Sequence, residues 1–176
     1  MCSSDLLTPL AVDPGHPFPF ISNLSLSLAI TLYNPAQDTE QFARIKVPTN
    51  HNRWVPVDEP NHLVPLEQVI AHNLDDLFRG MEIRTVNAFR VTRNADMRRE
   101  EEEADDLLEM ISDELRERRF APVVRLEVEA DMPANVRDLL MNELRLAPED
   151  VYETASLLGL AHCMPIAQFD RADLTY

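Results

Sequence analysis

The clearest pattern along the chain is a strict alternation of apolar and small residues between Leu24 and Leu32. The apolar positions are Leu24, Leu26, Leu28, Ile30 and Leu32, and the positions between them are Ser25, Ser27, Ala29 and Thr31. A period of two predicts a β-strand with one buried face. We expect the leucine face to be core and the small, polar face to be open, so that Ser27→Ala would be nearly silent.

Weaker patterns predict the remaining elements. Strand spacing covers residues 42–47, 54–57, 83–93, 124–128 and 151–154, and helical spacing covers residues 66–78, 104–115, 136–144 and 156–163. Pro65 suits a helix start, and Gly80 a position just after a helix end. Residues 7–20 hold four prolines and one glycine, which indicates an extended, turn-rich segment.

The order of these elements is a β-rich first half followed by β-α-β-α-β. It predicts an α+β fold, with a mixed β-sheet and helices packed on it. At least one parallel strand pair with a right-handed crossover is expected. A length of 176 residues fits one domain and suffices to bury a core.

The net charge and the cysteine content indicate which partners the chain can bind and in which compartment it works. The net charge of −15 opposes binding of nucleic acids and anionic membranes over the general surface, so a polyanion could bind only at a local arginine cluster. Cys2 and Cys163 make no disulfide framework, which indicates a reduced, cytosolic setting. The apolar stretch Leu24 to Leu32 is too short to span a membrane.

No residue pattern predicts a catalytic, cofactor or metal site. The three glycines are isolated, so neither a Walker loop nor a dinucleotide fingerprint can be drawn through them. The histidines and cysteines lack metal-ligand spacing. His16 could be a phosphorylated or acid–base histidine, but in a proline-rich turn it more often packs. The acids of Glu100–Glu103 diverge around a helix and fit a solvated helix start better than an ion site.

Two arginines on the strand over residues 83–93 are the sharpest candidates. Phe89, Val91 and Arg93 share one face of the strand, while Arg90, Thr92 and Asn94 share the other. An arginine on an apolar face is rarely unpaired. We expect Arg93 to pair with an acid such as Asp96 or Asp105 and to anchor the following helix. A place at an inter-domain or subunit face and direct contact with phosphate remain the alternatives.

Two aromatic residues complete the structural or interface candidates, which are Arg90, Arg93, Asn94, Phe18 and Phe20. Pro17-Phe18-Pro19-Phe20 presents two rings on a stiff backbone. Such a segment is either a core plug at the start of a domain or a ledge for a partner.

Several stretches together resemble the middle, or head, region of bacterial polyphosphate kinase. They are residues 17–26 (PFPFISNLSL), 42–48 (FARIKVP), 77–81 (LFRGM), 89–96 (FRVTRNAD) and 124–128 (VRLEV). The resemblance implies an enzyme that reversibly transfers the terminal phosphoryl group of ATP to polyphosphate through a phosphohistidine, assisted by Mg²⁺. It also implies an oligomer in which the head region helps to form the dimer and frames the catalytic tunnel.

In that family an adenine-binding helical domain precedes this region, and the phosphohistidine and phosphate-binding arginines follow it in two phospholipase-D-like domains. None of those motifs has a match here, so the resemblance transfers no catalytic residue and no cofactor to this segment. We therefore expect a fragment that is inactive alone. The remaining domains of the same polypeptide would be its partners, and those domains would bind ATP and polyphosphate.

The resemblance also predicts boundaries. Residues 1–6 depart from the family, and Cys-Ser-Ser-Asp-Leu corresponds to a translated sequencing adapter, so we expect them to be an artefact. Residues 7–165 would be the middle domain, and residues 166–176 the start of a linker to the catalytic domains. We expect a cytoplasmic enzyme. Whether the full-length protein associates peripherally with a membrane is left open. The alternative is a free-standing acidic α+β interaction module without catalysis.

Overall fold

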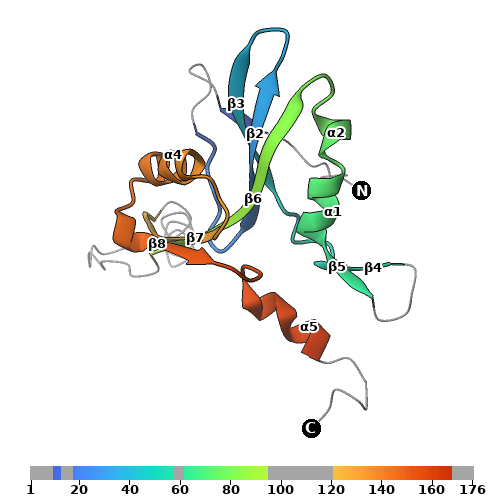
Figure 1. Ribbon diagram of the computed structural model, residues 1–176. Coiled ribbons are helices and arrows are strands. Elements are labelled where there is room, and N and C mark those ends of the chain that lie inside the picture. Colours follow the sequence, from blue (N-terminus) through green and yellow to red (C-terminus); the bar gives the residue numbers. More distant parts are fainter. Residues whose placement is uncertain (1–9, 13–17, 58–61, 95–120, 168–176) are drawn as a thin grey trace, which may run out of the picture.

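A computed structural model describes residues 10–12, 18–57, 62–94 and 121–167 of the chain (Figure 1). Within these residues the main element is a six-stranded sheet with the order β1-β3-β2-β6-β7-β8. Its strands are β1 (Leu10–Val12), β2 (Leu26–Asn34), β3 (Thr39–Lys46), β6 (Glu82–Arg93), β7 (Val123–Glu129) and β8 (Val151–Thr154). All neighbours are antiparallel except β7 and β8, which are parallel. The predicted α+β fold with a mixed sheet is confirmed.

Helices cover both faces of the sheet. The helices are α1 (Leu66–His72), α2 (Leu74–Leu77), α4 (Ala134–Leu144) and α5 (Met164–Ala167), with 3-10 turns η1 (Pro148–Asp150) and η2 (Leu160–Cys163). A separate two-stranded sheet pairs β4 (Trp54–Pro56) with β5 (Leu63–Pro65). In Figure 1, α4 lies on one side of the main sheet and α1 on the other.

Two apolar clusters form the core, one on each face. On the α4 side, Val136 and Leu140 pack with Phe89 and Val91 of β6 and Leu126 and Val128 of β7. On the α1 side, Ile70 and Leu74 pack with Leu28, Ile30 and Leu32 of β2 and Ile45 of β3. The alternation of side chains along β2, β3 and β6 therefore divides their apolar residues between the two clusters.

The expectation of an open polar face on β2 is wrong. Ser27 and Ala29 are fully buried, and Leu28, Ile30 and Leu32 on the leucine face are buried as well. The reason is that β2 lies between β3 and β6 in a sheet covered on both sides. Leu24 was expected in the core, but it precedes the strand, has φ 58° and is 48% exposed.

Other predicted elements change in detail. The helix predicted over residues 66–78 is divided into α1 and α2 at Asn73, whose backbone is not helical. Only Leu160–Cys163 and the adjoining α5 are helical in the last segment. The short strands β1 and β5 were not predicted. The predicted helix over residues 104–115, the acids Glu100–Glu103, His16 and residues 1–6 lie outside the described residues.

Candidate functional site

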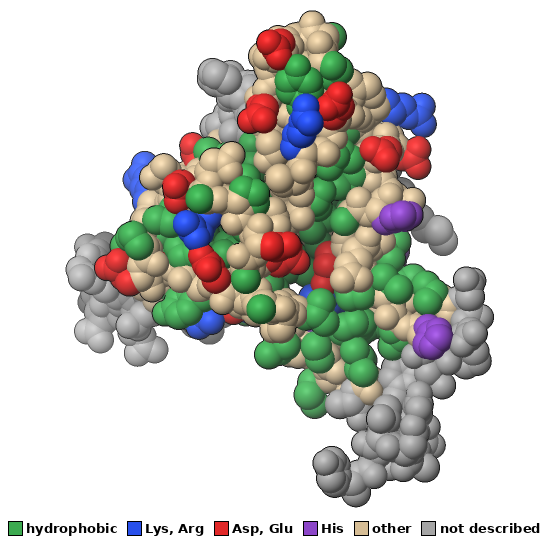
Figure 2. Space-filling model, viewed as in Figure 1, with side chains coloured by type: hydrophobic (Ala, Val, Ile, Leu, Met, Phe, Trp, Pro, Cys, Tyr) green, Lys and Arg blue, Asp and Glu red, His purple; other side chains and the backbone are tan. Residues whose placement is uncertain are grey.

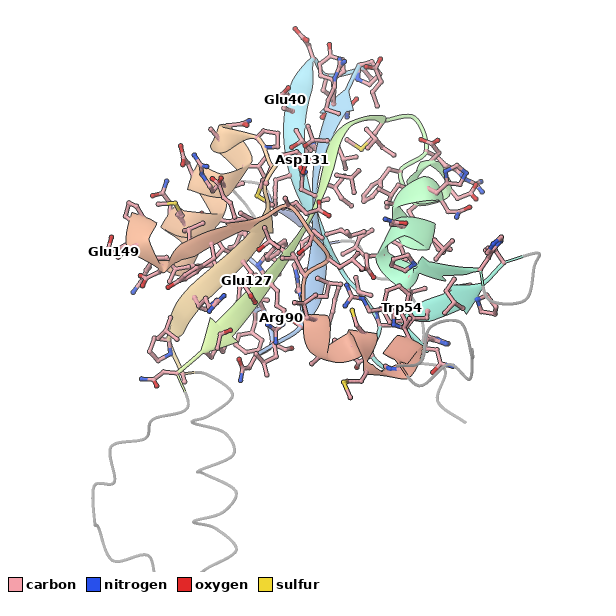
Figure 3. All side chains as sticks on the ribbon, turned by 60° about the horizontal axis from the view of Figure 1, so that its bottom comes forward. Glu40, Trp54, Arg90, Glu127, Asp131 and Glu149 are labelled. Atoms are coloured by element: carbon pink, nitrogen blue, oxygen red, sulfur yellow. The ribbon has the colours of Figure 1, made fainter. Side chains whose placement is uncertain are left out.

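Arg90 forms an ion pair across two strands of the sheet. It lies opposite Glu127 of β7, and its Nη1 is 2.6 Å from Oε2 of that residue, with side chains 19% and 16% exposed (Figure 3). Its Nε donates to the carbonyl oxygen of Leu24. Arg125 approaches the other oxygen of Glu127 at 3.2 Å and stacks on the ring of Tyr152. Arg90 thus joins β6, β7 and the segment before β2.

Arg93 contacts backbone carbonyls and an aromatic ring. Its Nε donates to the carbonyl oxygen of Ile21 at 2.9 Å, and its Nη1 to that of Ala121 at 2.5 Å. The guanidinium lies 4.4 Å from the ring centroid of Phe20, a cation–π distance. Burial lowers the pKa of Arg93 from its ordinary value. The acids expected to pair with it, Asp96 and Asp105, lie outside the described residues.

The remaining candidates from the sequence do not converge on one site. Phe18 stacks on Phe42, with ring centroids 6.0 Å apart, at the edge of the α4-side cluster. Phe20 is 38% exposed beneath Arg93. The backbone N–H of Asn94 donates to the carbonyl oxygen of Pro122. The structure therefore unites Arg93 with Phe20, and places Arg90 with different partners.

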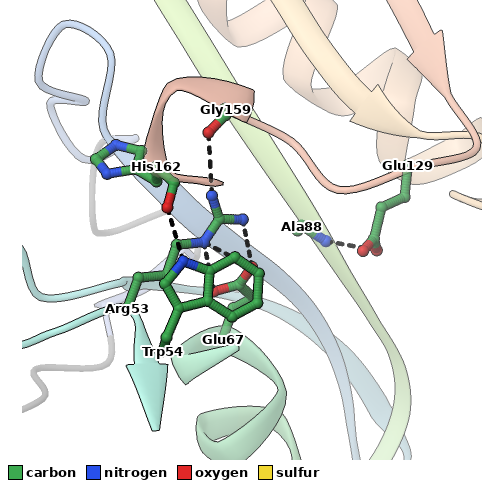
Figure 4. A network of polar contacts seen from close by, with 7 residues as sticks. All are labelled: Arg53, Trp54, Glu67, Ala88, Glu129, Gly159 and His162. Atoms are coloured by element: carbon green, nitrogen blue, oxygen red, sulfur yellow. Dashed lines mark hydrogen bonds and ion pairs between the residues drawn. The ribbon is translucent and has the colours of Figure 1, made fainter. Parts of the chain in front are cut away.

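Sequence reasoning missed a partly buried network that includes the last described segment, which we call the anchor site: Arg53, Trp54, Glu67, Gly159 and His162 (Figure 4). The Arg53 Nη2 lies 2.5 Å from Oε1 of Glu67, and their side chains are 9% and 7% exposed. Arg53 Nη1 also donates to the carbonyl oxygen of Gly159 at 3.2 Å. The next residue, Trp54, donates its Nε1–H to the carbonyl oxygen of His162 at 2.7 Å.

The anchor site holds a segment more than a hundred positions away in sequence. Residues 53 and 54 supply both donors, so η2 and the residue before it are fixed to the β4–β5 sheet and α1. Gly159 adopts φ 67°, a left-handed conformation that favours glycine. No local spacing could have revealed these contacts, because they depend on how distant segments fold together.

A second arginine that sequence reasoning missed is Arg44 of β3. It is 4% exposed, and it donates from Nε to Ser27 Oγ and from Nη1 to the carbonyl oxygen of Phe20. Its Nη2 has no partner within the described residues. Burial lowers the pKa of Arg44 to about 10. Its position between Ala43 and Ile45 in a predicted strand was the available signal.

Acidic side chains border an open groove beside the anchor site. The groove has a volume of about 550 Å³, and Glu67, Glu129, Asp131 and Leu158 contribute to its walls. Glu129 accepts a hydrogen bond from the backbone N–H of Ala88 at 2.7 Å. Burial, and secondarily the nearby Asp131, raise the pKa of Glu129. No group of His, Cys, Asp and Glu in the described part of the chain is suited to hold a metal ion.

These contacts define the class of protein. Arg53, Arg90 and Arg93 bind carboxylates and carbonyl oxygens of the chain itself, so they stabilise contacts between segments of an α+β domain. Across the described residues, no helix is both long enough and apolar enough to cross a membrane.

The comparisons identify the family. A family model described as the polyphosphate kinase middle domain matches residues 4–166, and the chain belongs to this family. It is 54% identical over 167 residues to a polyphosphate kinase of Synechocystis, covering 88% of this chain and 23% of that protein. It is 49% identical to one of Mycolicibacterium gilvum, covering 96% of this chain and 24% of that protein. The chain thus spans about a quarter of the length of these relatives.

A solved structure has the same fold. The crystal structure of polyphosphate kinase from Porphyromonas gingivalis matches with a TM-score of 0.71 and 20% identity, covering 97% of this chain and 24% of that chain. The boundaries predicted at residues 7 and 165, and the roles of Arg90, Arg93, Asn94, Phe18 and Phe20, stay predictions.

Proposed function

We propose that this chain is the non-catalytic middle domain of a cytoplasmic enzyme that reversibly transfers the terminal phosphoryl group of ATP to polyphosphate. The observation that carries the proposal is the 54% identity to the Synechocystis polyphosphate kinase, in which the matching segment is only 23% of the protein. The phosphohistidine, ATP and Mg²⁺ would belong to other parts of that enzyme. The described residues offer no ligand set for Mg²⁺, so no chemical step is assigned to them.

The polar contacts of the domain support a structural role. Arg53 and Arg90 are each committed to a carboxylate of the domain, and Arg93 to two carbonyl oxygens. An extended polyanion needs several guanidinium groups that can turn toward it. We infer that the domain positions its neighbours and contributes to a dimer, with Arg93 and Phe20 as the candidate contact.

A domain exchange tests the proposal. Residues 4–166 replace the matching segment of the Synechocystis enzyme, and synthesis of polyphosphate from labelled ATP and Mg²⁺ is measured beside the isolated 176-residue chain. The expected result is an active chimera and an inactive isolated chain that takes up no label. A folded but inactive chimera, or a phosphohistidine formed on the isolated chain, would contradict the proposal.

A further inference from the structure

The last segment of the described chain presents apolar side chains to solvent. Leu160 is 66% exposed, Met164 61% and Ile166 37%, and Val57 beside β4 is 40% exposed. We call these four residues the C-terminal ledge. Figure 2 shows hydrophobic side chains gathered at this lower end of the molecule, over the region of η2 and α5 in Figure 1.

The sequence of this segment differs from the rest of the chain. Residues 154–169 contain no Asp, Glu, Lys or Arg, although 27% of the whole chain is charged. Depletion of charge together with exposed methionine and aliphatic residues is typical of the core of an interface. In so acidic a chain, an ordinary surface segment of this length would be expected to carry charged residues.

The segment that leads into the ledge is anchored to the rest of the domain. Leu158, just before it, is 4% exposed in the α1-side cluster. Arg53 binds the carbonyl oxygen of Gly159, and Trp54 that of His162. Apolar side chains that are already ordered lose less conformational entropy when a partner covers them. The anchor site therefore prepares the ledge for binding.

We propose that the C-terminal ledge is the docking surface for the domain that follows in the same polypeptide, in the enzyme that the proposed function implies. Three observations select this occupant. The family model ends at residue 166, within the ledge. That family is a middle domain, and the chain spans about a quarter of its relatives, so further polypeptide adjoins it in them. The last described element, α5, carries Met164 and Ile166 of the ledge, so polypeptide that continues from α5 starts beside this surface.

Hydroxyl-radical footprinting read by mass spectrometry tests the proposal. The modification rate of Met164 is compared between the isolated 176-residue chain and the active chimera described above. We expect this rate to fall at least about tenfold in the chimera. A tenfold fall corresponds to a free energy of about 1.4 kcal/mol for opening the interface. Tyr152 of β8, which is 46% exposed, is the exposed control, and the buried Met132 is the protected control.

The outcomes separate this inference from the proposed function. An active chimera in which Met164 reacts as fast as in the isolated chain overturns the inference and leaves the proposed function standing. Protection of Met164 in the isolated chain that grows with its concentration would assign the ledge to a second copy and also overturns it. A chimera that is folded but inactive contradicts the proposed function, and this is read from the activity rather than from the modification rate of Met164.

Paired variants test the surface directly. Leu160→Asp in the chimera should raise the modification rate of Met164 about tenfold, because a charge in an apolar interface opposes docking. Val124→Asp places the same charge on an apolar residue that is 44% exposed on β7, and should leave that rate unchanged. Circular dichroism confirms that both variants fold. Equal rates in the two variants would overturn the inference.

Discussion

Arg53 and Glu67 form an ion pair with an Nη2–Oε1 distance of 2.5 Å, in which both side chains are less than a tenth exposed. Removing one partner from such a pair leaves a buried charge without compensation. We expect Arg53→Met to lower the free energy of unfolding by about 3–5 kcal/mol in a urea titration.

A second ion pair provides the control for that measurement. Arg84 approaches Glu82 at 2.9 Å, but their side chains are 50% and 55% exposed. Arg84→Met should therefore cost no more than about 1 kcal/mol, because solvent screens an exposed pair. Similar losses in the two variants would show that Arg53 and Glu67 are solvated in solution.

Substitutions on both faces of β2 should lower the stability of the domain, whereas the sequence predicted a silent effect on the Ser27 face. Leu28 is 3% exposed, and Leu28→Ala should cost about 2–5 kcal/mol. Ser27→Ala, expected from the sequence to be silent, removes the oxygen that accepts from Arg44 Nε and should cost about 1–3 kcal/mol. Denaturant titration of both variants decides this. A silent Ser27→Ala would mean that Arg44 finds another acceptor.

The raised pKa of Glu129 predicts how the stability of the domain depends on pH. Burial raises its folded-state pKa above the ordinary 4.5, so the native chain binds this proton more tightly than the unfolded chain does. The stabilisation that results is complete below pH 4.5 and is lost as the pH rises through the raised pKa.

Glu129→Gln isolates this effect. Glutamine never ionises and still offers an oxygen to the N–H of Ala88. The stability of the variant relative to the unsubstituted chain should therefore increase from pH 4 to pH 8 in urea titrations. Glu129→Ala removes the acceptor and should be less stable than Glu129→Gln at every pH. A difference between Glu129→Gln and the unsubstituted chain that is constant with pH would contradict the assignment.

The sequence predicted the fold class and most strands because those depend on local alternation. Val124, Leu126 and Val128, for example, identify β7 from their spacing alone. It could not predict that β2 is buried on both faces, because Ser27 and Ala29 look like solvent-facing residues until the helices that cover them are placed. β1 and β5 were missed because each has only three residues and shows no apolar–polar alternation, although the equally short β4 was predicted at residues 54–57.

The candidate contacts were likewise only partly predictable from the sequence. Arg93 could be recognised because it interrupts the apolar face of its strand, and Arg90 because it lies on the opposite face of the same strand. Most of their partners could not: apart from the carboxylate of Glu127, they are the backbone carbonyls of Leu24, Ile21 and Ala121, which leave no trace in the sequence. The anchor site joins Arg53 to Gly159 across 106 positions, and only tertiary structure reveals that contact.

The final prediction compares the two arginines of β6. Arg93→Met deprives the carbonyl oxygens of Ile21 and Ala121 of their donor and should cost about 1–3 kcal/mol. Arg90→Met should cost less, because Glu127 keeps Arg125 at 3.2 Å. At about 2–4 °C per kcal/mol for a domain of this size, thermal unfolding resolves the difference.

The chimeric enzyme gives the Arg93 variant its functional test, because it reports stability, assembly and phosphoryl transfer together. If Arg93 is structural or lies at a subunit contact, Arg93→Met lowers the melting temperature or the sedimentation coefficient, and activity falls only in proportion to the folded, assembled fraction. Arg90→Met in the same enzyme is the matched control, since it removes the same group three positions earlier on the same strand. If Arg93→Met instead keeps stability and assembly but loses phosphoryl transfer, the guanidinium contacts substrate and the structural assignment is wrong.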